Sequence, residues 1–262
     1  MRPDEGRLVE RRALGRTGLM VSPLGLGTVK LGRSEGVKYP HPVRIPTDDE
    51  AAALIARAEE LGINLIDTAP AYGTSEDRLG SLLKGRRDRW VVCTKVGEEF
   101  VDGVSRFDFS AGAVTASVDR SLRRLRTDVI DVVLLHSDGL IEADPREPME
   151  ALARLKEAGK VRAIGASTKT AAGGLLAAAA CDVVMLTLNP GHAEDLPAIA
   201  AAKGRGAGVL VKKAFGSGHL AMEEASRRAC LRLALSTPGV SSVITGTASI
   251  PHLEANVAAA RA

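Results

Sequence analysis

The stretch Asn64-Leu-Ile-Asp-Thr-Ala-Pro-Ala-Tyr-Gly-Thr-Ser-Glu76 contains a strand end, a forced turn and a helix start. Its first half is apolar and predicts a short buried strand, after which Pro70 and Gly73 exclude any regular element. The Ser-Glu pair at its end is typical of the first turn of a helix. The strand presents the carboxylate of Asp67, and the loop presents the phenol of Tyr72 five residues later. We therefore expect a strand–loop–helix unit with two ionisable groups at the carboxyl end of the strand.

Two later apolar runs end on groups that complement this pair. Trp90-Val-Val-Cys-Thr-Lys95 ends on a lysine, and Val129-Ile-Asp-Val-Val-Leu-Leu-His136 ends on a histidine. Taken singly, the aspartate would be a turn cap, the tyrosine a rim aromatic, the lysine a solvated strand end and the histidine a hydrogen-bonded loop residue. Because all four lie at or just after strand ends, a shared functional site is the stronger interpretation.

The rest of the chain repeats this alternation of strand and helix. The predicted strands cover residues 24–28, 64–68, 90–95, 130–136, 162–167, 183–189, 208–213 and 242–246. The predicted helices cover residues 47–61, 75–83, 110–125, 148–158, 171–179, 194–203, 222–235 and 251–260. The strands are nearly continuous apolar runs, as expected for parallel strands that are covered on both faces. Strict alternation favours the α/β class and a single (β/α)8 barrel, the TIM barrel.

The segment before the first strand predicts a short N-terminal β-hairpin, because residues 12–22 have glycines around a turn. Residues 1–12 are charged and polar and are expected to form a flexible tail, so we assign residues 13–262 to one barrel domain. A doubly wound open sheet is the rival fold. Against it, Gly25-Leu-Gly27 continues to Lys30 instead of to the third glycine of a dinucleotide fingerprint.

The composition of the 262 residues is that of an ordinary globular chain with few aromatic side chains. The formal net charge of +3 is small and the arginines are scattered, which argues against a nucleic-acid or membrane surface. The three cysteines lie far apart without a CxxC pair, which is typical of reduced thiols. No apolar stretch has the length of a membrane span and no signal peptide is predicted, so we expect a cytoplasmic protein.

The order Asp67, Tyr72, Lys95 and His136 at strand ends resembles the catalytic tetrad of the aldo-keto reductases. The similarity covers nearly the whole chain and is strongest in Asp67-Thr-Ala-Pro-Ala-Tyr-Gly73, Thr94-Lys95, Leu135-His136 and Gly159-Lys-Val-Arg-Ala-Ile-Gly-Ala-Ser167. The resemblance implies an NAD(P)H-dependent oxidoreductase that interconverts an aldehyde or ketone and the corresponding alcohol.

The four residues can supply the proton chemistry of such a reaction. A carbonyl group that accepts a hydride develops negative charge on its oxygen and needs a proton donor. A phenol is a poor acid at neutral pH, because its free pKa is about 10. The Lys95 ammonium beside it favours the phenolate, and Asp67 keeps that ammonium charged and oriented. With His136 hydrogen-bonded to the same substrate oxygen, Tyr72 is expected to be the general acid in reduction and the base in the reverse reaction.

The resemblance also implies a nicotinamide cofactor bound without a Rossmann domain. The positions that match the family's cofactor contacts are Gly27 and Thr28 at the nicotinamide ribose, Asp67 of the tetrad, Ser167 and Thr168 at the carboxamide, the turn Phe215, Gly216, Ser217 and Gly218 at the pyrophosphate, Gly246 and Thr247 before the last helix, and Asn256 at the adenine. The family often stacks an aromatic ring on the nicotinamide from the end of the seventh strand. In Lys213-Ala-Phe215, either Ala214 or Phe215 falls at that place.

The chain departs from the family pattern at four positions of the expected cofactor site. Thr168 replaces the usual asparagine, and Met185 stands where a glutamine is usual. Gly246 and His252 replace the lysine and the arginine that bind the 2′-phosphate. Because a phosphate needs fixed positive charge or strong donors, this site is depleted. We favour NADP(H) on family habit and keep NAD(H) as the alternative.

The substrate is expected to be a small-molecule carbonyl or alcohol, bound by the loops at the same face. These loops cover residues 30–46, 96–109 and 137–147. Tyr39, Phe100 and Phe107 are candidates for the apolar walls of the pocket, or else they pack the loops onto the barrel. The chain ends soon after its last predicted helix, so a more open pocket is expected than in relatives with a long carboxyl-terminal loop.

Two other functions are compatible with the sequence. A barrel of the same family could bind a nicotinamide cofactor in a regulatory role without catalysis. A Schiff-base lyase could use Lys95 or Lys213, but it would leave the other three tetrad residues without a shared purpose. No metal-binding residues are predicted, and the oligomeric state is not indicated by the sequence.

Overall fold

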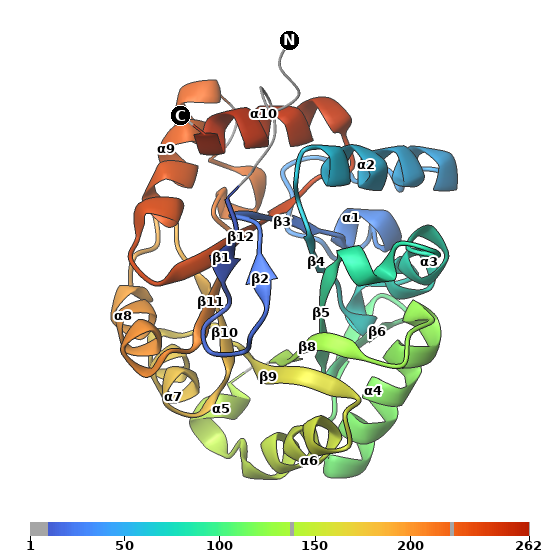
Figure 1. The fold of residues 1–262 in the computed structure, drawn as a ribbon, viewed down its shortest axis with the longest axis vertical. Helices are drawn as coiled ribbons and strands as arrows, with labels where there is room; N and C mark the ends of the chain where they lie inside the picture. The colour runs from blue at the N-terminus through green and yellow to red at the C-terminus, as the bar shows by residue number, and fades with distance from the viewer. Residues whose placement is uncertain (1–9, 137–138, 221–222, 262) are drawn as a thin grey trace.

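Eight parallel strands close into a barrel with helices around its outside (Figure 1). The computed structural model describes residues 10–136, 139–220 and 223–261. The barrel strands are β3 (Leu24–Gly27), β4 (Leu65–Asp67), β5 (Val91–Val96), β8 (Ile130–His136), β9 (Val161–Ser167), β10 (Val183–Thr187), β11 (Gly208–Lys212) and β12 (Val240–Gly246). Their order is β10-β11-β12-β3-β4-β5-β8-β9, and pairing of β12 with β3 is one link of the closed ring. The prediction of a single (β/α)8 barrel is confirmed.

The outer helices lie close to their predicted ranges. They are α2 (Asp48–Glu60), α3 (Ser75–Leu82), α4 (Ala111–Leu125), α6 (Arg146–Glu157), α7 (Ala171–Ala180), α8 (Leu196–Arg205), α9 (Glu224–Ser236) and α10 (Ile250–Arg261), with the shorter α1 (Val29–Gly32) and α5 (Leu140–Ala143) in loops. Thr47 caps α2 in a reciprocal capping box with Glu50, as their spacing predicts. The predicted start, at residue 222, of the helix that corresponds to α9 lies outside the described residues. No helix in the described ranges is long and apolar enough to cross a membrane.

The core has two parts, because side chains of each strand point alternately to the two faces of the barrel wall. Between the strands and the helices lies the larger cluster, which includes Leu26, Ile66 and Val133. Inside the barrel lies a smaller cluster, which includes Cys93 and Met185. Both clusters consist mainly of Ala, Val, Leu and Ile, as expected from the low aromatic content.

The N-terminal hairpin lies across one end of the barrel (Figure 1). Its strands β1 (Arg12–Ala13) and β2 (Met20–Val21) pair antiparallel, which confirms the hairpin prediction. Leu14, Leu19 and Val21 join the cluster inside the barrel. Arg12 donates hydrogen bonds to the carbonyls of Leu235 and Val240, and residues 1–9 of the expected tail lie outside the described residues. The hairpin therefore closes the end of the barrel opposite to the loops that follow the strands.

A second hairpin, β6 (Glu98–Val101) with β7 (Val104–Phe107), lies in the loop after β5 and was not predicted. Asp102 and Gly103 form its turn, both with positive φ, and Asp-Gly is the sequence pair that favours this type of two-residue turn. The signal was therefore present in the sequence. The two short strands contain no buried residue and lack the continuous apolar character by which the barrel strands are recognised.

The contact between α3 and α4 depends on a glycine. A Cβ atom added at Gly80 would lie 2.0 Å from the carbonyl oxygen of Arg124. We expect Gly80→Ala to lower the free energy of unfolding by about 1–3 kcal/mol, since overpacking outweighs the helical preference of alanine. Gly204→Ala, in α8 with open space around it, is the matched control and should raise stability by roughly 0.5–1 kcal/mol. Urea denaturation measures the free energy of unfolding of both variants. A change of the same sign in the two variants would contradict the packing argument.

Candidate active site

The predicted tetrad meets at the carboxyl ends of three neighbouring strands. Asp67 ends β4, Lys95 lies one residue before the end of β5, and His136 ends β8. Since β4 pairs with β5 and β5 with β8, the three side chains project at one side of the barrel mouth. Tyr72 reaches them from the 3₁₀ turn η1 (Pro70–Tyr72). The sequence prediction that these four residues lie together is in agreement with the structure.

Lys95 and Asp67 form a buried ion pair. The Nζ atom of Lys95 lies 2.7 Å from Oδ1 of Asp67 and donates a second hydrogen bond of 2.8 Å to the carbonyl oxygen of Thr68. The two charged residues are only 1% and 4% exposed. Burial lowers the pKa of Lys95, but Asp67, together with Tyr72 and Cys93, raises it by more, so the net pKa is raised. Lys95 is therefore a permanent cation at neutral pH.

Tyr72 lies beside this cation, with the Lys95 Nζ atom 4.8 Å from the centre of the phenol ring. Its turn is fixed by Gly73, which has a φ of 60° and lies so close to Gly32 that an added Cβ would contact the Gly32 carbonyl at 2.1 Å. Burial raises the pKa of Tyr72 to about 12, although the charge of Lys95 opposes it. The sequence argument expected Lys95 to favour the phenolate, but burial decides the net shift. The phenol therefore keeps its proton at neutral pH.

His136 stands edge-on to Tyr72, with ring centroids 6.3 Å apart and an interplanar angle of 84°. Burial lowers the pKa of His136, so the ring is neutral at physiological pH. The Nδ1 atom lies 2.7 Å from Oε2 of Glu98, in a contact that is short but off the hydrogen-bond direction of the ring. Glu98 is in turn held by Ser105, whose hydroxyl donates to Oε1 at 2.6 Å. The contact engages Nδ1, one of the two ring nitrogens of His136.

Glu98 is a residue of the site that the sequence analysis missed. It begins β6, and only the hairpin geometry brings its carboxylate against the end of β8. Although burial raises the pKa of Glu98, the contact with His136 and the bond from Ser105 lower it to about 2. The unnoticed Asp-Gly turn was the one signal that could have located it.

The positions predicted for the carboxamide lie next to a second lysine. Ser167 ends β9 and Thr168 follows it, and both are buried. Lys212, the last residue of β11, donates from Nζ to Oγ of Ser167 at 2.8 Å and to the carbonyl oxygen of Thr168 at 2.6 Å. The Oγ1 atom of Thr168 is buried without a hydrogen-bond partner in the described structure. Met185 stands where the family usually has a glutamine, and its side chain packs inside the barrel.

The remaining predicted cofactor positions are placed by the strands β3 and β12 and by the turn η3 (Gly216–Gly218). Gly27 pairs with Gly246 between the two strands, and Thr28 donates to the carbonyl oxygen of Asp67 at 2.9 Å. The turn from Phe215 has positive φ at three successive residues, Gly216, Ser217 and Gly218. Thr247 and Asn256 are buried near and within α10. The cofactor contacts of these residues stay predictions.

The candidate wall residues differ in their surroundings. A Cβ atom added at Gly246 would lie 3.2 Å from the phenol oxygen of Tyr39, so Tyr39 covers the β12 end. Phe100 stacks on the guanidinium of Arg33 at 3.4 Å, and Phe107 stacks on Phe109. For the two phenylalanines, the interpretation as loop packing fits these contacts better than an open pocket wall.

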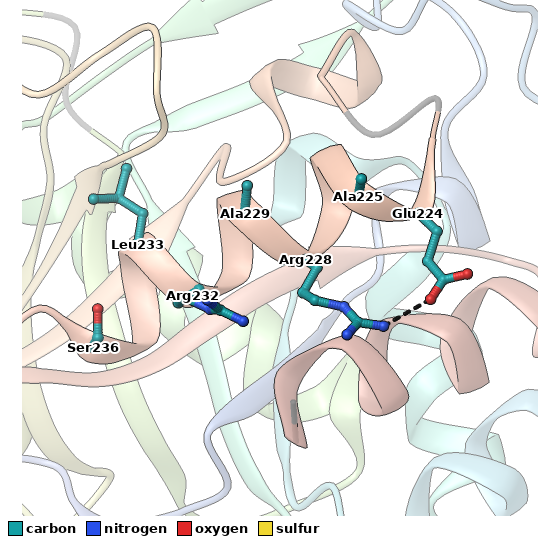
Figure 2. Close-up of a pocket in the computed structure, with 7 residues that line it drawn as sticks. All are labelled: Glu224, Ala225, Arg228, Ala229, Arg232, Leu233 and Ser236. Atoms are coloured by element: carbon teal, nitrogen blue, oxygen red, sulfur yellow. Dashed lines mark hydrogen bonds and ion pairs between the residues drawn. The ribbon is translucent and has the colours of Figure 1, made fainter.

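One cavity of about 780 Å³ lies away from the tetrad, on the outer helix α9 (Figure 2). Its lining residues are Glu224, Ala225, Arg228, Ala229, Arg232, Leu233 and Ser236. Arg228 is paired with Glu224 at 2.8 Å along the helix surface. Since all lining residues belong to one helix and none to the tetrad, we assign the cavity no part in the chemistry.

Comparison with known proteins agrees with this geometry. Residues 23–227 match the model of the Aldo/keto reductase family. L-galactose dehydrogenase of Arabidopsis thaliana is 32% identical over 96% of this chain and 88% of its own length, and D-threo-aldose 1-dehydrogenase of a Pseudomonas species is 29% identical over 82% and 72%. Other curated relatives match over about half of their length, among them the aldo-keto reductase YhdN of Bacillus subtilis, with 61% of this chain and 47% of its own.

Solved structures are similar over almost the full chain. A Pseudomonas aeruginosa protein, PA4992, described provisionally as an aldo-keto reductase, has a TM-score of 0.87 and 50% identity, with 97% of this chain and 95% of its own covered. The holo form of the aldo-keto reductase AKR11C1 from Bacillus halodurans has a TM-score of 0.79 and 28% identity, with 97% and 91% covered.

The contact of Glu98 with His136 makes a prediction about titration. Because the carboxylate raises the pKa of His136 against the effect of burial, Glu98→Gln should lower that pKa further. Nuclear magnetic resonance of the histidine ring protons across pH 4–8 measures it. Ser105→Ala keeps the Glu98 charge and should change the His136 pKa less. An unchanged or higher pKa in Glu98→Gln would show that the carboxylate does not act on the ring.

Proposed function

The chain belongs to the aldo/keto reductase family, and from this premise we propose that it transfers hydride between a nicotinamide cofactor and a carbonyl carbon while Tyr72 gives a proton to the carbonyl oxygen. Membership of the family makes the protein an oxidoreductase that interconverts carbonyl compounds and alcohols. The observation that carries the finer proposal is the Lys95 ammonium, held between the Asp67 carboxylate and the Tyr72 ring.

Each tetrad residue has a distinct part in the proposed reduction. Tyr72 is protonated at neutral pH and donates its proton as negative charge develops on the substrate oxygen. The phenolate left behind is stabilised by the Lys95 ammonium, which Asp67 keeps charged. His136 is neutral and therefore carries a single N–H, so donation of a hydrogen bond to the substrate oxygen requires the tautomer with the proton on Nε2, the ring nitrogen that does not face Glu98. In the reverse reaction the Tyr72 phenolate accepts the proton from the alcohol.

The residues at the carboxamide position fit a nicotinamide cofactor. Thr168 has a buried hydroxyl without a partner in the described structure, and a carboxamide offers both a donor and an acceptor to it. Ser167, beside it, can donate its hydroxyl proton while its oxygen accepts from Lys212. The bound cofactor would supply the hydride. The turn around Ser217 and the amino end of α10 are the proposed sites of the pyrophosphate and adenosine part.

The alternative of a Schiff-base lyase is disfavoured by the charge state of Lys95. An amine that forms an imine needs a lowered pKa, whereas the contact with Asp67 raises the pKa of Lys95. A regulatory barrel without turnover would not require the buried ion pair and protonated phenol to be retained. For the substrate we propose sugar-like aldehydes and lactols first, because two relatives are named as dehydrogenases of L-galactose and D-threo-aldose.

Replacing the two tyrosines of the chain tests the proposed acid. Tyr72→Phe should reduce kcat for aldehyde reduction by about 10²–10⁴-fold, because it removes the proton donor, and should leave NADPH affinity unchanged. Tyr39→Phe makes the same chemical change outside the tetrad and should keep kcat within a few-fold. Steady-state kinetics with a panel of aromatic aldehydes and aldoses, together with fluorescence titration of NADPH, measure both. Full activity in Tyr72→Phe would refute the role of Tyr72.

The depleted 2′-phosphate site makes a prediction about cofactor choice. His252 lies exposed in the first turn of α10, where the family pattern has an arginine. His252→Arg should lower the Kd for NADPH by roughly tenfold through a charge-assisted contact, with no change for NADH. Calorimetry with both nucleotides measures this, and NADH serves as the control within the same variant. Equal gains for both nucleotides would place the 2′-phosphate elsewhere.

A further inference from the structure

Lys212 is a half-buried lysine for which the proposed reaction has no use. It ends β11, and its Nζ atom donates to Oγ of Ser167 at 2.8 Å and to the carbonyl oxygen of Thr168 at 2.6 Å. Both partners are uncharged. Within the described ranges, no carboxylate lies within ion-pair distance of this nitrogen. Lys212 thus differs from Lys95 on the other side of the mouth, whose charge is neutralised by Asp67.

The charged and titratable groups around Lys212 come from several strands and loops. They are Lys213 next in the chain, Lys95 on β5, Asp67 on β4, Asp195 before α8, and His136 on β8. Burial lowers the pKa of Lys212 to about 7, and the positive charges of Lys213 and Lys95 act in the same direction. The carboxylates of Asp195 and Asp67 raise this pKa from a distance, without forming an ion pair with the amine. The amine therefore changes its charge near neutral pH, whereas Lys95 stays charged there.

The charge of Lys212 lies next to Ser167 and Thr168, the two residues proposed to bind the carboxamide of the nicotinamide. If they bind the carboxamide, as proposed above, the nicotinamide ring lies within several ångströms of the Lys212 nitrogen. The oxidised ring carries a positive charge and the reduced ring carries none. A cation about 6 Å away therefore penalises only the oxidised form, and at an effective dielectric constant of about 20 the penalty corresponds to a factor on the order of 10–100 in affinity.

We propose that Lys212 is a specificity-determining residue whose ammonium, held by Ser167 and Thr168, makes the site bind the reduced nicotinamide cofactor more tightly than the oxidised one. The inference rests on the proposed function, since it needs the carboxamide at Ser167 and Thr168. It adds a discrimination between the two redox states to the binding of the cofactor.

The direction of the pH dependence follows from linkage. The oxidised ring binds best to the uncharged amine, so its binding releases a proton from Lys212, whereas the reduced ring binds without this release. The preference for the reduced form is therefore largest below about pH 7 and declines as pH rises and the amine loses its proton. The ratio of the Kd of the oxidised cofactor to the Kd of the reduced cofactor isolates this effect. Groups that interact equally with both forms change both Kd values by the same factor and do not change the ratio.

The test measures the Kd of NADPH and of NADP⁺ at pH 6.0 and pH 8.5, with NADH and NAD⁺ as a second pair. Fluorescence titration measures the reduced form, and displacement of that form measures the oxidised one. In the wild-type protein, the ratio of oxidised to reduced Kd should be about tenfold or more larger at pH 6.0 than at pH 8.5. Lys212→Met should give a small ratio at both pH values, and Lys212→Arg a large ratio at both.

Each result decides for or against the inference. A wild-type ratio that does not change with pH, or a ratio in Lys212→Met equal to that of wild type at pH 6.0, would overturn it. Lys212→Arg and the wild-type pH series decide the question even if Lys212→Met does not fold. Absence of binding by both nucleotide pairs in the wild-type protein would instead refute the proposed function, so the two failures are distinguishable.

Discussion

The burial of the Lys95 ammonium is the constraint on which the rest of the site depends. A buried charge without a partner is strongly unfavourable, so the barrel must place the Asp67 carboxylate and the Thr68 carbonyl within bonding distance of Nζ. Pairing of β4 with β5 achieves this, because the two residues lie at adjacent strand ends. The same cation then faces the ring of Tyr72. One electrostatic requirement of the fold thereby produces the arrangement that we propose to donate the proton.

The surrounding segments set the charge state of each group by different means. Burial keeps the proton on Tyr72, while contact with Asp67 keeps the proton on Lys95. His136 is kept neutral by burial although Glu98 approaches it. Lys212 has only neutral hydrogen-bond partners and is held near its titration point. The local surroundings at the barrel mouth therefore give four neighbouring ionisable groups four different charge states: a neutral phenol, a charged amine, a neutral imidazole and an amine that titrates near neutral pH.

Much of the fold and the tetrad could be predicted from the sequence, because barrel strands are apolar and end in conspicuous polar residues. The positions of Asp67, Lys95 and His136 follow from strand ends alone. Glu98 could not be placed in this way, since it depends on a hairpin within a loop. Lys212 was missed because a lysine at a strand end is usually solvated. Only the pairing of β11 with β10 shows that the strand ends at Lys212, one residue before the predicted end at Lys213.

The N-terminal hairpin has a consequence for how the chain is made. Leu14 leaves the ribosome early, yet the glycine after it lies against the backbone of residues 206–208, and Arg12 is held by carbonyls of Leu235 and Val240. This early segment must therefore wait for segments made about 200 residues later before its apolar side chains are covered. Contacts of such long sequence separation are slow to form. Until then, the apolar side chains inside this end of the barrel lack their cover, and such exposed apolar surface favours aggregation of a folding chain.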